Sequence, residues 1–247
     1  MIQLKNINHS YGENTVLNNF NLTVQARHTT TLIGPSGCGK STILRLINGL
    51  IKPDNGEVII DGVQLSDSNL RNMRLKIGYL IQEGGLFPNL NAKKNITLMA
   101  SRLKWSNEKI QERLYKLCQM THFPEEALEQ YPMELSGGQR QRVSLMRALM
   151  LDPEILLLDE PFGALDPIIR SGLHDSLIEI FNELHKTVLI VTHDLNEAAY
   201  LSDNIILINN GNIVQSGTIK ELIDTPANPF VSQFIKAQRS HLQEGSL

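Results

Sequence analysis

The sequence is poor in aromatic residues, in cysteine and in long apolar runs. Aromatics make up 5% of its 247 residues, with a single Trp, and the two cysteines are Cys38 and Cys118. Two cysteines form neither a disulfide framework nor a zinc cluster. No apolar run approaches the roughly 20 residues that cross a bilayer, and residues 1–5 lack the features of a secretory signal. These absences predict a cytosolic protein without a membrane span.

The charge is nearly balanced. There are 23 Lys and Arg residues against 26 Asp and Glu residues, which gives a net charge of −3. A protein held on nucleic acid by bulk charge is usually basic, so we expect no nucleic-acid partner. With 41% hydrophobic and 20% charged residues, the composition is typical of a globular protein with a core.

Short β-branched apolar runs alternate with longer amphipathic stretches. The runs predict strands at residues 29–33, 58–60, 77–81, 155–158, 188–191 and 205–208. The stretches predict helices at residues 40–50, 106–120, 139–151 and 167–184. This alternation predicts an α/β fold with a mostly parallel sheet and helices on both faces.

Other regions depart from this rhythm. Residues 2–5 and 22–24 look like strands with no helix between them, which predicts an antiparallel β edge. A mostly helical stretch from about 83 to 150 predicts an inserted subdomain within a single domain that spans 1–247. Residues 209–212 predict a tight hairpin. Thr218 and Glu221 have capping-box spacing, as do Asp194 and Glu197 in looser form, and a short helical tail is expected over about 218–247.

Residues 34–41 match the pattern G-x-x-x-x-G-K-[ST] at every specified position. The match follows a predicted strand and opens a predicted helix, as the pattern requires. Its glycines allow backbone N–H groups to face phosphate oxygens, Lys40 supplies a positive charge, and the Ser41 hydroxyl can bind Mg²⁺. Cys38 lies inside this loop, either as a small spacer or as a redox-sensitive thiol, whereas Cys118 fits a core position.

Two acids, Asp159 and Glu160, follow the apolar run at 155–158. An acid at the tip of a buried strand near a phosphate loop can hold the Mg²⁺ shell, as Asp159 would. Glu160 could then accept a proton from an attacking water. Taken alone, the pair could equally be a helix cap or solvated loop acids.

The segment Leu-Ser-Gly-Gly-Gln at residues 135–139 precedes a predicted helix. Ser136 and Gln139 have capping spacing, so the segment could simply be a good helix start. The adjacent glycines Gly137 and Gly138 weaken a helix, however, and close backbone approach to an anion is one reason to keep them.

Together and in this order, these motifs resemble the ATP-binding subunit of ABC transporters over essentially the whole chain. The resemblance implies a P-loop NTPase fold with a mostly parallel sheet, an antiparallel β edge subdomain and an inserted helical subdomain. It also identifies Gln82 as the Q-loop glutamine, His193 as the switch histidine and Tyr11 as the aromatic that stacks on adenine, with Val16 nearby. Residues 164–166 match the D-loop.

The site residues that the resemblance implies fall into three groups. The catalytic group is Glu160, His193, Lys40 and Gln82. The ATP-binding group is Tyr11, Val16, Gly34, Pro35, Ser36, Gly37, Cys38, Gly39, Lys40, Ser41, Thr42, Ser136, Gly137, Gly138, Gln139 and Asp166. The Mg²⁺ ligands are Ser41, Gln82 and Asp159.

The same resemblance implies partners and a mechanism. Two copies, or one copy and a closely related ATPase subunit, meet head to tail and hold each ATP between the phosphate loop of one and residues 136–139 of the other. Closure of this dimer would move transmembrane permease subunits, served indirectly by a solute-binding receptor. The protein would then lie at the cytoplasmic face of the plasma membrane. Phe87 and Pro88 would either contact the permease or anchor the helical subdomain.

The segments at 82–90 and 159–166 resemble bacterial importer subunits. Residues 84–88 and 226–231 most resemble importers of glycine betaine, choline and similar quaternary amines. Many such ATPases carry a tandem CBS domain, for which a chain ending at residue 247 leaves no room, so polar amino-acid import and a split-type exporter remain alternatives. The stripe of Phe230, Phe234 and Ile235 predicts packing of the tail on the main domain or, alternatively, a partner contact. The specificity motif of GTPases, Asn-Lys-x-Asp, is absent from the sequence.

Overall fold

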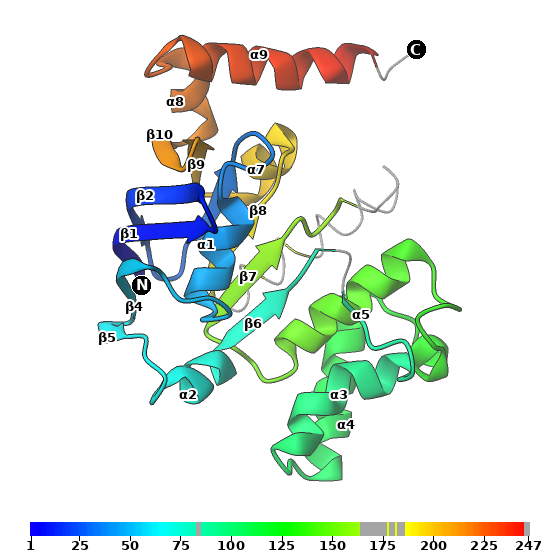
Figure 1. Ribbon diagram of the computed structural model, residues 1–247. Helices are drawn as coiled ribbons and strands as arrows, with labels where there is room; N and C mark the ends of the chain where they lie inside the picture. Colours follow the sequence, from blue (N-terminus) through cyan, green and yellow to red (C-terminus); the bar gives the residue numbers. More distant parts are fainter. Residues whose placement is uncertain (83–84, 164–176, 178–180, 182–185, 245–247) are drawn as a thin grey trace. The chain divides into compact units, whose positions relative to one another are not determined.

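The computed structural model describes residues 1–82, 85–163, 177, 181 and 186–244. These residues form two compact units, each of which is described by itself (Figure 1). Unit 1 comprises Met1–Leu70 and Thr187–Leu247, and unit 2 comprises Arg71–Lys186. Among the described residues, no helix has both the length and the apolarity that a membrane span requires.

Unit 1 contains an antiparallel sheet with the strand order β2-β1-β4-β5. Its strands are β1 (Ile2–Tyr11), β2 (Asn14–Val24), β4 (Asn55–Ile60) and β5 (Val63–Gln64). Ile2 faces Val24 on one side and Ile60 on the other. The predicted antiparallel edge is therefore confirmed.

Strand β4 corrects the prediction for residues 58–60, which we grouped with the parallel strands. The strand pairs antiparallel to β1. Val58 and Ile60 are buried whereas Ile59 between them is only half-buried. This alternation is typical of a strand with one covered face, as antiparallel sheets allow.

Unit 1 also contains the parallel strands β3 (Thr29–Ile33), β8 (Thr187–Val191) and β9 (Asn204–Asn209). β3 lies between β8 and β9 and is parallel to both. Every residue of β3 and β8 is buried, including Thr29, Thr30 and Thr31 of β3, as expected for strands that are covered on both faces. Strand β10 (Asn212–Gly217) pairs antiparallel to β9 through the predicted hairpin. Its turn residues Asn210 and Gly211 have φ values of 45° and 70°, as a type I′ turn requires.

The helices of unit 1 are α1 (Lys40–Ile47), α7 (Leu195–Leu201), α8 (Ile219–Asp224) and α9 (Pro229–Glu244). The predicted capping box of Thr218 and Glu221 starts α8. Val231 and Ile235 of α9 are buried in one core cluster with β9 and α7, and Phe230 and Phe234 pack against it. The predicted packing of the tail stripe is thus confirmed. Figure 1 shows the two tail helices, α8 and α9, in orange and red.

Unit 2 pairs the parallel strands β6 (Ile77–Leu80) and β7 (Ile155–Asp159) and carries the helical segment. The segment consists of α3 (Ala92–Arg102), α4 (Asn107–Met120), the 3₁₀ helix η1 (Glu125–Glu129) and α5 (Gly137–Leu149). Asn91, Ser106 and Ser136 cap the three α-helices with their side chains. A further short helix, α2 (Leu70–Leu75), was not predicted, and the helix predicted at 167–184 lies outside the described residues.

Candidate functional site

The phosphate loop of unit 1 runs from the end of β3 to the start of α1. Pro35, Ser36 and Gly37 are exposed at its tip, whereas Gly34 at its base is buried. Gly34 has a φ of 149°, and a Cβ built there would lie 2.1 Å from the carbonyl oxygen of Ile208 in β9. Because no side chain can occupy that space, Gly34 brings the loop directly against the β9 backbone.

The end of the loop is the amino terminus of α1. Gly39 is the N-cap residue, with a φ of 106° and no capping side chain. Ser41 is half-buried and Thr42 is buried in the first turn. A helix start without a side-chain cap leaves its N–H groups directed at a neighbouring anion. The loop therefore fits the β- and γ-phosphates of a nucleotide.

The Lys40 side chain lies over the loop that it is predicted to serve. Its Nζ donates hydrogen bonds to the carbonyl oxygens of Gly34, at 2.8 Å, and Pro35, at 3.0 Å. Lys40 is only 8% exposed. The loop carbonyls thus hold the ammonium group beside the exposed tip, where phosphate oxygens would approach.

Both cysteines are free and buried. The Sγ atom of Cys38 lies 3.7 Å from the Lys40 Nζ and faces the base of the loop at Gly34, which suits the spacer interpretation. Cys118 lies in the core of unit 2, as predicted. Burial, aided by the negative charge of Glu125, raises the pKa of the Cys118 thiol to about 11. That thiol is therefore protonated at neutral pH.

The β1–β2 hairpin places the predicted adenine-stacking residues next to the loop within unit 1. Tyr11 ends β1 and is 45% exposed. Val16 and Leu17 belong to β2. A Cβ built on Gly39 of the loop would lie 3.3 Å from the Val16 Cγ1 and 3.1 Å from the Leu17 Cδ2. Val16 therefore packs against the phosphate loop, and Tyr11 lies on the hairpin that makes this contact.

His193 comes from the same edge of unit 1 as the phosphate loop. Leu32 of β3 pairs with Val191 of β8, and the Thr192 N–H donates to the Leu32 carbonyl at 3.2 Å. The next residue in the chain is His193, which follows β8 and is exposed. Because parallel strands present their carboxyl ends together, His193 and Gly34 emerge at one edge.

The predicted capping box of Asp194 and Glu197 is wrong in its second half. Asp194 caps α7 by accepting a hydrogen bond from the Asn196 N–H, at 2.7 Å. Glu197 is buried and instead accepts a hydrogen bond from the Thr192 hydroxyl, which in turn accepts from the Asp194 N–H at 3.0 Å. Thr192, which we did not predict, therefore fixes the turn that carries His193.

In unit 2, Gln82 and the two acids follow adjacent parallel strands. Leu80 of β6 pairs with Leu158 of β7, so Gln82 and Asp159 leave the same edge. Asp159 is 4% exposed and Gln82 is exposed. Glu160 has a φ of 48°, a value that is uncommon outside glycine. Carboxylate and amide oxygens are suitable Mg²⁺ ligands, so this edge fits the metal side of a nucleotide site.

The segment at 135–139 forms a complete capping box. The Gln139 N–H donates to the Ser136 hydroxyl at 3.2 Å, and the Ser136 N–H donates to the Gln139 side chain at 2.9 Å. Helix α5 therefore starts at Gly137, two residues before the predicted start. Gly137, which is half-buried, and Gly138, which is buried, add no side chains to this first turn, which fits the close approach of a phosphate to the backbone.

Helix α5 connects this segment to the rest of the site in unit 2. The buried Gln141 side chain donates to the carbonyl of Pro161, just after Glu160. Arg147 donates to the Gly85 carbonyl at 2.9 Å, three residues after Gln82. Burial lowers the pKa of the Arg147 guanidinium from its ordinary value. The sequence analysis missed both residues because a Gln or an Arg in a helix is ordinarily exposed.

Asn95 holds the segment that begins at Phe87. It is fully buried, accepts a hydrogen bond from the Phe87 N–H at 2.8 Å, and donates to the carbonyls of Phe87, Leu90 and Asn91. The Phe87 side chain is 49% exposed. Of the two interpretations of Phe87, a buried anchor does not fit, and Asn95 supplies the anchoring instead.

Replacing Asn95 with alanine is expected to lower the free energy of unfolding by about 2–4 kcal/mol, because the Phe87 N–H and three carbonyl groups each lose a hydrogen bond to this fully buried side chain. Urea unfolding measures this change. The matched control is Asn89→Ala at an exposed position of the same loop, where we expect a change below about 0.5 kcal/mol. Equal effects of the two substitutions would contradict the anchoring role.

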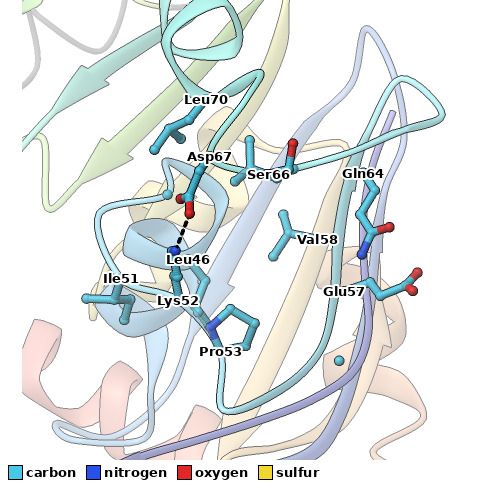
Figure 2. Close-up of a pocket in the computed structure, with 13 residues that line it drawn as sticks. Leu46, Ile51, Lys52, Pro53, Glu57, Val58, Gln64, Ser66, Asp67 and Leu70 are labelled. Atoms are coloured by element: carbon cyan, nitrogen blue, oxygen red, sulfur yellow. Dashed lines mark hydrogen bonds and ion pairs between the residues drawn. The ribbon is translucent and has the colours of Figure 1, made fainter.

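Unit 1 also contains a cavity of about 320 Å³ that none of the predicted site residues lines. Figure 2 shows Leu46, Val58 and Leu70 on its apolar walls. The exposed Lys52 and Asp67 form an ion pair of 2.6 Å across it. The phosphate loop, and not this cavity, is therefore the candidate nucleotide site of unit 1.

The predicted site residues thus form two groups. Unit 1 holds the phosphate loop at 34–42 together with Tyr11, Val16 and His193. Unit 2 holds Gln82, Asp159, Glu160 and residues 136–139. Asp166 lies outside the described residues.

The family model of ABC transporters matches residues 17–163. The range includes the phosphate loop, Gln82, the segment at 135–139 and both acids. The chain belongs to the ABC transporter family.

Two curated relatives are similar to this chain over nearly its whole length. The chain is 42% identical over 240 residues to the choline transport ATP-binding protein OpuBA of Bacillus subtilis (strain 168), covering 97% of this chain and 63% of that protein. It is 39% identical over 234 residues to the glycine betaine uptake system ATP-binding protein YehX of Escherichia coli (strain K12), covering 95% and 76%. The chain thus spans about 63% of the length of OpuBA.

Solved structures agree with the fold. The dimeric post-hydrolysis structure of the ATP-binding cassette MJ0796, bound to ADP and Pi, matches with a TM-score of 0.80 at 35% identity. The match covers 89% of this chain and 99% of that one. The α/β ABC cassette fold predicted from the sequence is therefore confirmed.

Proposed function

We propose that this chain is the ATP-hydrolysing motor subunit of a bacterial ABC importer, in which ATP binding and hydrolysis drive solute uptake. The observation that carries the proposal is the set of nucleotide-binding motifs among the described residues. A phosphate loop leads into helix α1, which has no side-chain cap, the buried Asp159 is followed by Glu160, and residues 136–139 form the capped start of α5. A scaffold that does not hydrolyse ATP would not need Lys40, Glu160 and His193 together.

In the proposed reaction, the phosphate loop and Lys40 bind the triphosphate, and Tyr11 and Val16 receive the base. Ser41, Gln82 and Asp159 would hold Mg²⁺, which supplies charge neutralisation on the phosphates. Glu160 accepts a proton from the attacking water, and His193 contacts the γ-phosphate.

The proposed assembly is a head-to-tail dimer with a second copy or a closely related ATPase subunit. Residues 136–139 of each subunit, together with Asp166, then complete the site on the other subunit. The dimer lies at the cytoplasmic face of the plasma membrane and binds transmembrane permease subunits. A solute-binding receptor delivers the solute to these permease subunits. The half-exposed Phe87 is a candidate permease contact.

The proposed solute is a quaternary amine osmoprotectant such as glycine betaine or choline. Support comes from the identity to ATP-binding proteins named for choline transport and glycine betaine uptake. A polar amino-acid importer is the first alternative, and a split-type exporter is the second.

The test is to purify the chain with the membrane proteins encoded beside it, reconstitute the complex in liposomes and measure ATP hydrolysis with the adjacent receptor. We expect stimulation by receptor loaded with glycine betaine or choline. Stimulation only by a receptor loaded with a polar amino acid would overturn the solute assignment. Purification with an export-type permease and no receptor would overturn the import assignment.

A further inference from the structure

His9 is a buried histidine in β1 to which the proposed mechanism gives no role. It is 7% exposed, and neither ring nitrogen has a hydrogen-bond partner within the described part of the chain. A buried imidazole is ordinarily fixed by hydrogen bonds. The neighbours that fix this ring must therefore act through other contacts.

The ring of His9 packs against the ring of Tyr11. The ring centroids are 4.8 Å apart, and the planes are nearly perpendicular at 88°. β1 is irregular between His9 and Ser10, so the ring contact itself, and not regular strand alternation, places the two rings together. Tyr11 is 45% exposed, which leaves part of its surface for a base while His9 supports another part. Edge-to-face pairs of this kind favour one relative orientation of the two rings.

The His9 side of the pair is itself fixed. Asp54 accepts a hydrogen bond from the Ser10 N–H at 2.8 Å, and its own N–H donates to the Asn8 carbonyl at 2.8 Å. Asp54 thus binds the backbone on both sides of His9, and its carboxylate lies 4.0 Å from the His9 Nδ1.

His9 also adjoins the strand that supports the phosphate loop. Its cross-strand partner is Leu17 of β2, whose side chain packs at Gly39. The rigid support under Tyr11 is therefore continuous with the support under the phosphate loop.

We propose that His9 is a positioning residue for the nucleotide base: its ring holds Tyr11 in the orientation that stacks on adenine. The inference rests on the proposed function, in which Tyr11 contacts the base. His9 itself does not contact the nucleotide.

The test compares ADP with pyrophosphate, both with Mg²⁺, by calorimetry on the full chain. His9→Ala is expected to weaken ADP binding roughly three- to ten-fold and to leave pyrophosphate binding within about two-fold. His9→Phe keeps a perpendicular ring and should restore ADP binding to within about two-fold. Ser10→Ala, which loses only the contact of its hydroxyl with Thr15, is the matched control. Thermal melting shows whether each variant is folded.

A double-mutant cycle with Tyr11→Ala separates the positioning role of His9 from the proposed stacking of Tyr11 on the base. If His9 acts through Tyr11, His9→Ala has no further effect on ADP binding once Tyr11 is removed. A Tyr11→Ala effect on ADP with no effect of His9→Ala would overturn the positioning role and leave base stacking intact. No effect of Tyr11→Ala would overturn both. Equal weakening of ADP and pyrophosphate by His9→Ala would assign His9 to the support of the phosphate loop and also overturn the proposal.

Discussion

Replacing Glu160 with glutamine is expected to lower the rate of ATP hydrolysis by roughly 100- to 10,000-fold, the range that a general base contributes. Glutamine keeps the size of the side chain and can still form hydrogen bonds, but it cannot accept the proton of the attacking water. ATP binding should therefore stay within about two-fold of the wild type, and an ATP-bound dimer should accumulate. Phosphate release measures the first effect, and size-exclusion chromatography with ATP and Mg²⁺ measures the second.

The matched control for this substitution is Glu154→Gln in the same unit. Glu154 is an exposed acid that forms an ion pair with Lys76 at 3.3 Å, so its replacement makes the same chemical change outside the site. We expect near wild-type turnover for the control. Near wild-type turnover of Glu160→Gln would instead show that another group takes the proton.

Replacing Lys40 with alanine is expected to raise the dissociation constant for ATP by roughly 30- to 1,000-fold, as the removal of one partner from a close charged pair does. The loss has two sources. The phosphates lose a positive charge at a site where the side chain is almost fully buried, and the carbonyls of Gly34 and Pro35 lose their shared donor. Calorimetry gives the affinity, and the shift of the melting temperature by ATP should disappear.

Lys52→Ala serves as the control for charge alone. Lys52 is exposed and paired with Asp67 across the cavity of unit 1. An exposed pair contributes little to stability, so nucleotide affinity should change by less than about two-fold. If both lysine variants lose the same affinity, the protein's overall charge and not the phosphate loop governs binding.

Strands that are buried on both faces were predicted more accurately from the sequence than strands that are buried on one face. β3 and β8 are buried at every residue, and their runs of β-branched and apolar residues predicted their positions closely. The β4 run has a half-buried residue between two buried ones, and three residues are too few to distinguish that alternation from a continuous run. The run was located correctly, but its sheet was wrong because pairing depends on contacts distant in sequence.

The site was predictable where one residue type is required by chemistry. The phosphate loop needs its glycines and its lysine, so a local pattern suffices. The supporting residues Gln141, Thr192 and Asn95 could not be found in this way, because a polar side chain in the core is recognised by its partners and not by its neighbours in sequence. The Glu197 carboxylate is an example: its spacing from Asp194 favoured a capping box, but the hydroxyl of Thr192 competes for it.

The close approach of Gly34 to the β9 backbone has a genetic consequence. Every amino acid other than glycine adds at least a Cβ, which at this position would lie 2.1 Å from the Ile208 oxygen. A missense change in the codon for residue 34 thus has no conservative version, since even alanine makes the same collision. Residue 34 is therefore constrained by the main chain at Ile208, which follows it by more than 170 positions in the sequence. A compensating change would have to move the main chain of β9. No side-chain replacement at Ile208 can do this.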